Sequence, residues 1–368
     1  TGKVYLDMIY EYSPLFIIIL SLSFLTISII FDIQSNKKLS ALIALVMILS
    51  YAILFGLRDY SIGSDTKAYI DNFLNRNWDF ELLFTLLTDA LRFISINERI
   101  YLISITVLYG IFIYYSYYIL GKNINEHIVI FIWCLLFSQS SIIGTINYFR
   151  QVLGFSFFLV GFSLYIKNLK FSTASIFIMT LSIFIHSSNA LLILIVIISK
   201  YLNIRLIILI LLLSLATFIF DVGGYISRNY NDYYIISRTI SRHIYFNDRR
   251  SISTIYLNII MYGFHLLVFL YLLKNKNIPV VHNKLYRAIK FYILVFALAI
   301  FMSFNREMAI RYYLLLPFLI PIIYMLSMKI EGINKIIKPF LVTITLVHLG
   351  YLLSRPWFID QLSGNITP

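Results

Sequence analysis

Cysteine is almost absent from this chain of 368 residues. The single Cys134 lies inside an apolar run, so neither a disulfide framework nor a thiolate metal site is expected. Acidic residues are also scarce, with 17 Asp and Glu against 30 Lys and Arg, which leaves a net charge of +13. No nucleic-acid-binding motif accompanies this charge, and half of the cations fall where loops would anchor membrane spans. We therefore exclude nucleic acid as a partner.

Other patterns are missing as well. Alternation of polar and apolar residues with period two does not occur, which argues against a transmembrane β-barrel. There are no tandem repeats of fixed short period. The first apolar run is long and lacks a small-residue cleavage site, so a cleavable signal peptide is not expected. No set of His, Asp and Glu has metal-ligand spacing, so no metal and no cofactor is predicted.

The residues that are present indicate a membrane protein. Hydrophobic residues make up 60% of the chain and the mean hydropathy is +0.85, which excludes an ordinary soluble domain. Runs of about 18–20 apolar residues match a hydrocarbon layer of about 30 Å. We predict an all-α polytopic protein with one transmembrane domain, 1–368, and about 12 spans. The spans are placed at 14–31, 39–57, 100–120, 128–144, 147–166, 171–186, 188–199, 203–220, 254–273, 288–304, 310–328 and 338–354.

The cations sort by type between the two faces that these spans define. One face carries 13 Lys and 2 Arg, and the other carries 2 Lys and 13 Arg. Total charge is equal, but short loops and span ends hold 15 cations on the lysine face and 5 on the arginine face, which favours a cytoplasmic lysine face. Arginine grips phosphate or carboxylate with a planar fork. The outer face is therefore predicted to bind an anionic ligand.

Two long segments are predicted to lie on the outer face. The first, 58–99, contains an amphipathic helix over 81–96, which lies along or dips into the membrane, because a span there would turn every later lysine outward. The second, 221–252, is rich in Tyr and Arg. It is either a solvated connector or a flap that covers a ligand, and its length and composition favour the flap. The residues of interest there are Tyr233, Tyr234, Arg238 and Arg242.

Arginine stands at the end of one predicted span and at the start of another. Arg58 ends a span and is followed by a Gly-containing turn in which Asp65 or Ser64 is expected to cap a helix that starts near Thr66. Arg150 opens a span, where a cation opposes the helix macrodipole unless an anion lies beside the free backbone N–H groups. Asn147 is expected to cap that span. Both arginines have a simpler interpretation as interfacial anchors, and for Arg150 we favour function.

Two further polar clusters fall on the same predicted face. His186 and Ser187 lie between two short apolar stretches, and they form either a polar turn or a proton-transfer site, since imidazole titrates near neutrality. Arg306 and Arg311 flank the start of a later span. Glu307 is spaced to pair with Arg311, which would leave Arg306 for a ligand.

These clusters together resemble the EpsG-like branch of the Wzy-type polysaccharide polymerases, the O-antigen polymerases. The order and spacing of the motifs carry the resemblance from residue 56 to about 313. The residues concerned are Gly56, Leu57, Arg58, Gly63, Asp65, Thr66, Tyr69, Glu81, Asn147, Arg150, Gln151, His186, Ser187 and Arg306.

The resemblance implies a glycosyltransferase of the bacterial inner membrane that works on the periplasmic side. The donor would be a growing glycan on undecaprenyl diphosphate, and the acceptor a single lipid-linked repeat unit. The product would be O-antigen, capsular or exopolysaccharide, and a chain-length regulator is a possible partner. The architecture would be that of membrane enzymes with polyprenyl-phosphate donors, the GT-C-like class. The reaction would need no metal and, as a single displacement, would invert the anomeric centre.

Site roles follow as expectations. Arg58, Arg150 and Arg306, with Arg311, are assigned to the diphosphate, whose departure develops negative charge. Glu81 or Asp65 is placed near the acceptor hydroxyl, with His186 in reserve. Sugar contacts are assigned to Tyr69, Asn147, Gln151 and the four residues of the Tyr/Arg segment.

Three alternatives stay open. An O-antigen ligase would transfer the same lipid-linked glycan to lipid A–core and also needs arginines and a histidine. A flippase for the same lipid would show cations on both faces of a cavity and internal pseudo-symmetry, neither of which the sequence shows. A non-enzymatic scaffold predicts that replacement of Arg150 has no effect.

Overall fold

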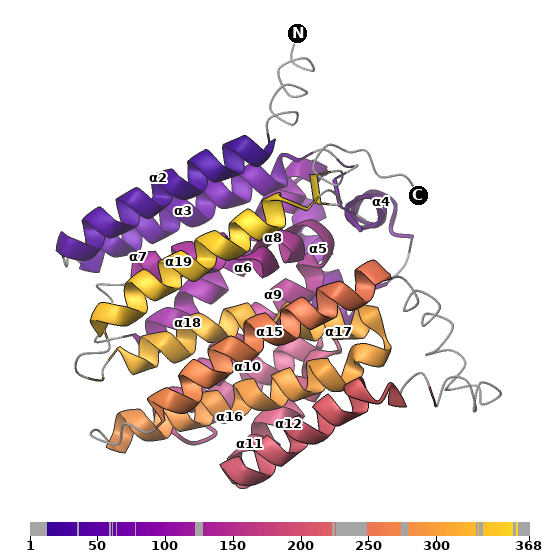
Figure 1. Ribbon diagram of the computed structural model, residues 1–368. Coiled ribbons are helices and arrows are strands. Elements are labelled where there is room, and N and C mark those ends of the chain that lie inside the picture. The colour runs from indigo at the N-terminus through magenta and orange to yellow at the C-terminus, as the bar shows by residue number, and fades with distance from the viewer. Residues whose placement is uncertain are drawn as a thin grey trace. The chain divides into compact units, whose positions relative to one another are not determined.

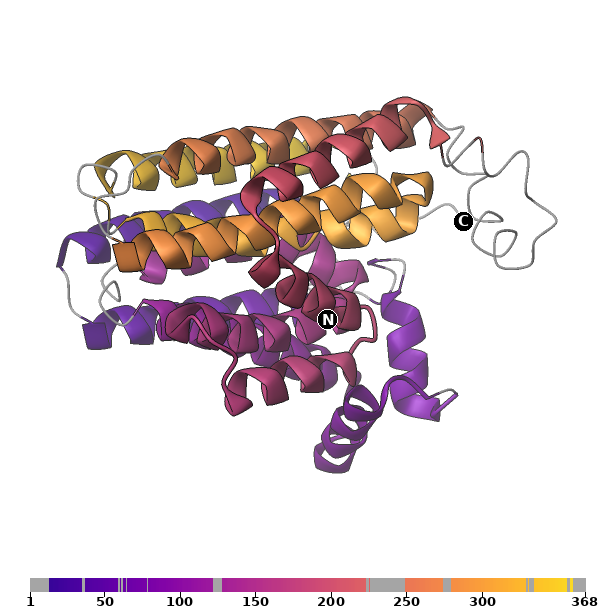
Figure 2. The same cartoon turned by 90° about the horizontal axis from the view of Figure 1, so that it is seen from below.

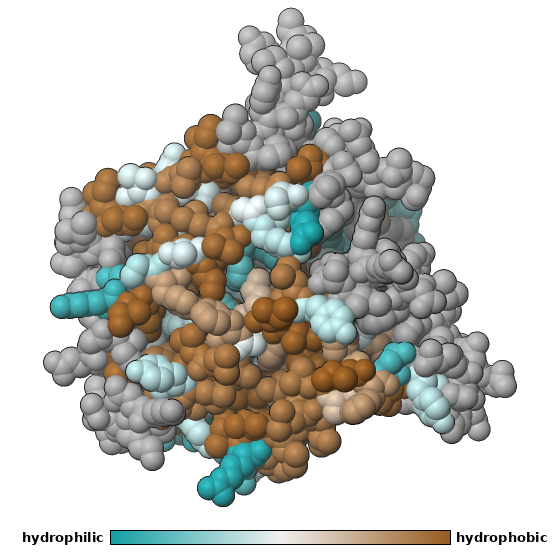
Figure 3. Space-filling view, viewed as in Figure 1, coloured by the Kyte–Doolittle hydropathy of each residue, from teal (hydrophilic) through white to brown (hydrophobic). Residues whose placement is uncertain are grey.

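The protein is helical throughout the part of the chain that its computed structural model describes. These residues are 13–34, 37–58, 60, 62–63, 65–77, 79–121, 128–222, 225, 249–273, 279–328, 330, 334–355 and 358–359. They contain no strand, as predicted. The helices group into two compact units: unit 1 comprises Thr1–Ala190 with Asn334–Pro368, and unit 2 comprises Leu191–Ile333. Hydrophobic side chains cover most of the face seen in Figure 3, as lipid contact would require.

Unit 1 holds the first nine of these helices, the start of α11 and the last long helix (Figure 1). They are α2 (Ser13–Gln34), α3 (Lys37–Gly56), α4 (Thr66–Asn75), α5 (Leu82–Ile94), α6 (Glu98–Leu120), α7 (Ile128–Leu136), α8 (Gln139–Asn147), α9 (Phe149–Asn168), α10 (Thr173–Ile183) and α19 (Asn334–Leu353). In its centre, α9 packs between α6 and α10, and α6 also packs on α3.

Unit 2 is built around α16 (Pro279–Phe301), which packs against α12 (Ile204–Ile219), α17 (Arg306–Tyr313) and α18 (Leu316–Ser327). The remaining elements are most of α11 (Asn189–Tyr201), α15 (Arg249–Leu272) and the short helix η3 (Met302–Phe304). His265 on α15 is fully buried and hydrogen-bonded to Tyr324 of α18, with 3.0 Å between Nδ1 and the hydroxyl.

Within the described residues, seven helices are long and apolar enough to cross a membrane, or eight if the bent pair α7 and α8 forms one span. The predicted count of 12 is therefore not confirmed. Helix α7 meets α8 at an angle of 55°, where the Ser138 side chain caps the new helix. Helices α10 and α11 have 11 and 13 residues, short of the roughly 20 that a span needs. The sequence predicted spans at 171–186 and 188–199 because the residues on both sides of the polar break at His186 and Ser187 are apolar.

The helix directions in unit 1 bring four chain segments to one end. Gly56 at the end of α3 lies against Ile103 near the start of α6. Tyr101 of α6 lies 6.1 Å, ring to ring, from Phe149 at the start of α9. Gly154 of α9 lies beside His186 in the turn that follows α10. We call this the arginine end, because Arg58 and Arg150 are located there.

The opposite end of unit 1 carries lysine. Tyr165 near the end of α9 stacks on Phe171 before α10, with ring centroids 4.5 Å apart, which places Lys167 and Lys170 away from the arginine end. Lys37 begins α3, whose other end is Gly56. The separation of lysine from arginine that the sequence showed therefore holds among the described helices of unit 1.

Candidate active site at the arginine end of unit 1

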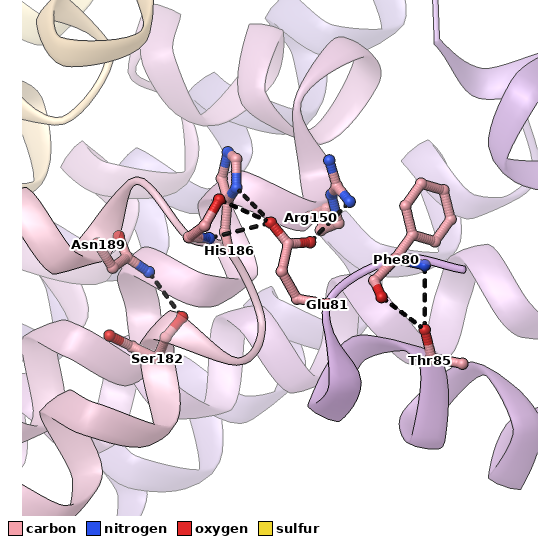
Figure 4. A network of polar contacts seen from close by, with 8 residues as sticks. Phe80, Glu81, Thr85, Arg150, Ser182, His186 and Asn189 are labelled. Atoms are coloured by element: carbon pink, nitrogen blue, oxygen red, sulfur yellow. Dashed lines mark hydrogen bonds and ion pairs between the residues drawn. The ribbon is translucent and has the colours of Figure 1, made fainter. Parts of the chain in front are cut away.

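Glu81 joins three segments that are far apart in the sequence (Figure 4). Arg150 donates from Nη1 to Oε2 of Glu81 at 2.8 Å. The backbone N–H and the hydroxyl of Ser187 both donate to Oε1, each at 3.0 Å. Nδ1 of His186 lies 3.4 Å from the same oxygen. Three predicted site residues, Glu81, Arg150 and His186, thus lie in one cluster.

Local structure explains why Glu81 reaches this position. Glu81 immediately precedes α5, and the first amides of that helix, on Leu83 and Phe84, donate to the carbonyl of Phe184 at 2.8 and 3.3 Å. Helix α10 ends at Ile183, so its C-terminal carbonyl satisfies N–H groups that the start of α5 leaves open. The start of α5 is thereby fixed beside the turn that carries His186.

Glycine allows that turn to approach α9. A Cβ on Gly154 would lie 2.8 Å from Nδ2 of Asn189 and 3.1 Å from Cβ of His186. Asn189 is buried and donates from Nδ2 to the carbonyl of Ser182 at 3.0 Å, which holds the end of α10 against the start of α11. The position of His186 therefore depends on a residue without a side chain one helical turn after Arg150.

The charge of Arg150 is balanced from within the chain. Arg150 lies in the first turn of α9, where the helix macrodipole disfavours a cation, and the carboxylate of Glu81 supplies the anion that the sequence called for. Its guanidinium also lies over the ring of Phe80, 4.4 Å from the centroid. Nε of Arg150 is enclosed and has no hydrogen-bond partner among the described residues.

Glu81 is held as a carboxylate. Burial raises its pKa, but hydrogen bonds from His186 and Ser187 and the charge of Arg150 lower it more, so that the pKa lies well below the usual range of glutamate. While these contacts persist, Glu81 is a strong hydrogen-bond acceptor and a weak base. Release of Arg150 would remove one of the causes of the low pKa.

Arg58 has a different environment from Arg150. It is only 3% exposed and donates from Nη1 to the carbonyl of Phe55 and from Nε and Nη2 to the hydroxyl of Thr66, at 3.3 and 3.0 Å. The Thr66 hydroxyl in turn donates to the carbonyl of Ile146 at 3.0 Å. Arg58 therefore ties the end of α3 to the start of α4 and the end of α8.

The predicted cap of α9 is wrong, and that of α4 agrees in position alone. Asp65 is the N-cap residue of α4, which begins at Thr66, but its side chain makes no capping hydrogen bond, and Ser64 lies outside the described residues. The cap position of α9 is Tyr148, without a side-chain cap, and Asn147 is the last residue of α8. Backbone geometry explains the error at α9, because the chain turns sharply at Tyr148 and separates Asn147 from the helix that it was expected to cap.

The residues assigned to sugars are largely interior where the structure describes them. Tyr69 is buried, with its ring 5.5 Å from that of Phe80 and 4.0 Å from that of Phe149. Asn147 and Gln151 are buried as well. Tyr69 thus packs against Phe80, whose ring lies beneath the Arg150 guanidinium, and the assignment of all three residues to sugars stays a prediction.

The remaining predicted site residues lie elsewhere. Arg311 is half-buried on α17 of unit 2. The side chains of Arg306 and Glu307 and the whole of Tyr233, Tyr234, Arg238 and Arg242 lie outside the described residues. The predicted meeting of Arg58, Arg150 and Arg306 in one pocket therefore stays a prediction.

Phe80 is a contact of Arg150 that was not predicted, and its only signal in the sequence is that it precedes Glu81. Ser187, which donates to Glu81, was predicted only as part of the polar cluster with His186. Among the described residues, no group of three or more His, Cys, Asp or Glu side chains is placed to hold a metal ion.

Comparison with protein families identifies the chain. The model of the EpsG family matches residues 41–357, which include every residue of the cluster around Glu81. The chain belongs to the EpsG family. The resemblance drawn from the motifs is thereby confirmed, and membership of the EpsG family suggests a membrane polymerase of polysaccharide biosynthesis. No curated protein and no solved structure matches the chain.

Proposed function

We propose that this EpsG-family protein polymerises oligosaccharide repeat units carried on undecaprenyl diphosphate, by glycosyl transfer at the arginine end of unit 1. This end faces the periplasm in the proposal, because lysine marks the opposite end. The observation that carries the proposal is the convergence of Glu81, Arg150 and His186 from three separate segments.

The donor diphosphate is assigned to Arg150. The acceptor hydroxyl oxygen attacks the anomeric carbon of the donor glycan, and the bond from that carbon to the phosphate oxygen breaks. Undecaprenyl diphosphate leaves with the electron pair, and a guanidinium beside it stabilises the developing charge without a metal ion. Attack from the opposite side inverts the anomeric centre. Arg58 supports the site from the interior, since its donors already bind Phe55 and Thr66.

Glu81 and His186 are assigned to the acceptor hydroxyl. In the structure Glu81 occupies the place that a phosphate oxygen would take on Arg150. A diphosphate carries more charge than a carboxylate and displaces it, and the freed Glu81 becomes more basic because a cation has left its side. The acceptor proton then passes to Glu81 or to His186 beside it. Binding of the donor thus makes Glu81 basic enough to accept the proton of the acceptor hydroxyl.

The test uses Arg150→Ala and Arg150→Lys in a cell whose surface glycan depends on this chain. Both variants should leave at most one repeat unit per lipid carrier at normal protein level, because lysine cannot bind two oxygens in one plane. The matched control is Arg76→Ala, whose side chain is 68% exposed and pairs with Asp89 on the surface. Wild-type glycan ladders in the Arg150 variants would refute the proposal.

The same experiment separates the alternatives. If long glycans accumulate on undecaprenyl diphosphate and never reach lipid A–core, the chain is a ligase. Purified wild-type protein that lengthens a lipid-linked repeat unit in detergent excludes a flippase and a scaffold, since neither forms a glycosidic bond.

A further inference from the structure

On helix α5 the charged side chains face the protein and the apolar side chains face outward, which is the opposite of a helix on the surface of a soluble protein. Its charged side faces the protein: Arg92 donates to the carbonyls of Phe73 and Asn72 at 2.6 and 3.0 Å and pairs with Asp89. Arg92 thereby satisfies carbonyls in the last turns of α4. Phe84 is buried on the same inner side.

The outer side of α5 is an exposed apolar stripe. Phe93 is 94% exposed and Leu82 is 62% exposed, and Leu86, Ala90 and Ile94 complete one face at helical spacing. The stripe continues past the helix end through Ile96 to Ile100, which begins the exposed side of the candidate span α6. We call Leu82, Leu86, Ala90, Phe93, Ile94 and Ile96 the outer stripe.

Both ends of α5 are fixed at the arginine end of unit 1. At the start, Leu83 and Phe84 donate to the carbonyl of Phe184, and Glu81 binds Arg150 at the start of α9. At the other end, only three residues separate α5 from α6, which begins at the same end as α9. Figure 2 shows α4 and α5 together at this end. With 13 residues, α5 is about 20 Å long and cannot cross the hydrocarbon layer.

We propose that α5 is an interfacial helix whose outer stripe is inserted into the lipid leaflet at the arginine end. The occupant is lipid, because the stripe is continuous with the membrane-facing side of α6 and because the starts of two candidate spans hold the helix at membrane level. Burial of the stripe in the upper acyl region removes large apolar side chains from water, while Asp89 and Arg92 keep their partners in the protein.

One consequence rests on the proposed function. Glu81 is the residue before α5, so an interfacial α5 places the Glu81–Arg150 pair at headgroup depth. The diphosphate of a lipid carrier lies at that depth. The carrier would therefore reach Arg150 sideways from the leaflet, with its polyprenyl chain remaining in lipid.

The test measures depth directly on the full chain in lipid nanodiscs. On a Cys134→Ala background, Phe93→Cys and Leu86→Cys are labelled with an environment-sensitive fluorophore, and Arg76→Cys provides the exposed polar control. Quenching is compared between aqueous iodide, lipids with a spin label high on the acyl chain, and lipids with a spin label near the bilayer centre.

We expect both stripe positions to be quenched most by the shallow lipid label and at least about threefold less by iodide than position 76. Strong iodide quenching at positions 86 and 93 would overturn the proposal, because the stripe would then face water or wait for a protein partner. Strongest quenching by the deep label would overturn it as well, because the helix would then enter the bilayer core. The readout needs no transferase activity, so it stands or fails separately from the proposed function.

Discussion

The substitution Glu81→Gln tests the exchange between the Glu81 carboxylate and the donor diphosphate. Glutamine keeps the size of the side chain and one carbonyl oxygen, so the Ser187 N–H and hydroxyl retain an acceptor. It removes the charge that now balances Arg150 at 2.8 Å. We therefore expect tighter anion binding together with lost turnover, a combination that a general structural defect does not produce.

The magnitude follows from the geometry of the pair. Two unit charges about 4 Å apart in a medium of effective dielectric constant 20 interact by about 4 kcal/mol. The two side chains are 22% and 21% exposed, so solvent screening and the cost of desolvation reduce the net coupling to about 1–2 kcal/mol. A difference of 1.4 kcal/mol is tenfold in affinity. Inorganic pyrophosphate should bind the glutamine variant about tenfold more tightly than it binds the wild type.

Turnover should fall at the same time. If Glu81 takes or orients the proton of the acceptor hydroxyl, the uncharged amide cannot do so, and general-base contributions are typically about 10²–10⁴-fold. The assay measures pyrophosphate affinity by calorimetry and elongation of a lipid-linked repeat unit with purified protein. Glu98→Gln is the matched control, because Glu98 is also a carboxylate at the arginine end, at the start of α6, but it accepts its hydrogen bond from the Tyr60 hydroxyl.

The pH dependence of thermal stability provides a second measurement on the Glu81–Arg150 pair. The pKa of Glu81 is lowered in the folded state, so its contribution to stability is fully present above the unfolded pKa of about 4.3 and is lost as the pH falls toward the folded pKa. The gap in thermal stability between wild type and Glu81→Gln should be constant above about pH 6 and should shrink below about pH 4.

Unchanged pyrophosphate affinity of Glu81→Gln, or near-normal elongation by this variant, would refute the exchange between Glu81 and the donor diphosphate.

Two further substitutions test the interior that supports the site. Gly63→Ala should abolish stable expression, because Gly63 has φ of +90° and a Cβ there would lie 2.6 Å from the carbonyl oxygen of Ile146; normal yield and melting temperature in detergent would contradict this. Thr66→Val should lower the free energy of unfolding by about 1–3 kcal/mol, because it removes the hydroxyl that accepts from Nε and Nη2 of the buried Arg58, whereas Thr66→Ser should behave as wild type; equal thermal stability of the two variants would show that the hydroxyl does not hold Arg58.

Some features of the fold could be predicted because their causes are local. The amphipathic helix expected at 81–96 is α5, Leu82–Ile94, since periodic leucines define its face regardless of what packs there. The two ends of unit 1 also follow from sequence, because lysine and arginine sort with alternate loops. The break at 137–138 could not be found from hydropathy, because the residues around it are apolar and only capping and turning divide α7 from α8, whereas the break at 187 lies between two of the predicted spans.

Of the candidate site, the sequence predicted three residues that the structure brings together, Glu81, Arg150 and His186, but not the contacts that each of them makes. Arg58 and Arg150 looked alike as arginines at the ends of spans. What separates them is the partner of each: the carbonyl of Phe55 and the hydroxyl of Thr66 for Arg58, and a carboxylate 69 residues distant for Arg150. Partners so far apart in the sequence cannot be recognised from neighbouring residues. The position of Arg150 can, because a cation in the first turn of a helix is unfavourable in the helix dipole and indicates a nearby anion.

The unfavourable position of Arg150 at the start of α9 also links donor binding to glycosyl transfer in the proposed reaction. A cation at the start of α9 needs an anion, and in the proposed reaction the donor replaces the one that the chain supplies, because the Glu81–Arg150 pair is partly exposed. A lysine there would be satisfied by any single oxygen. The planar guanidinium instead favours a ligand with two oxygens in one plane, which a diphosphate offers. If the proposal holds, selection for the donor and release of Glu81 are the same event, and Arg150→Lys should fail even though the charge is kept.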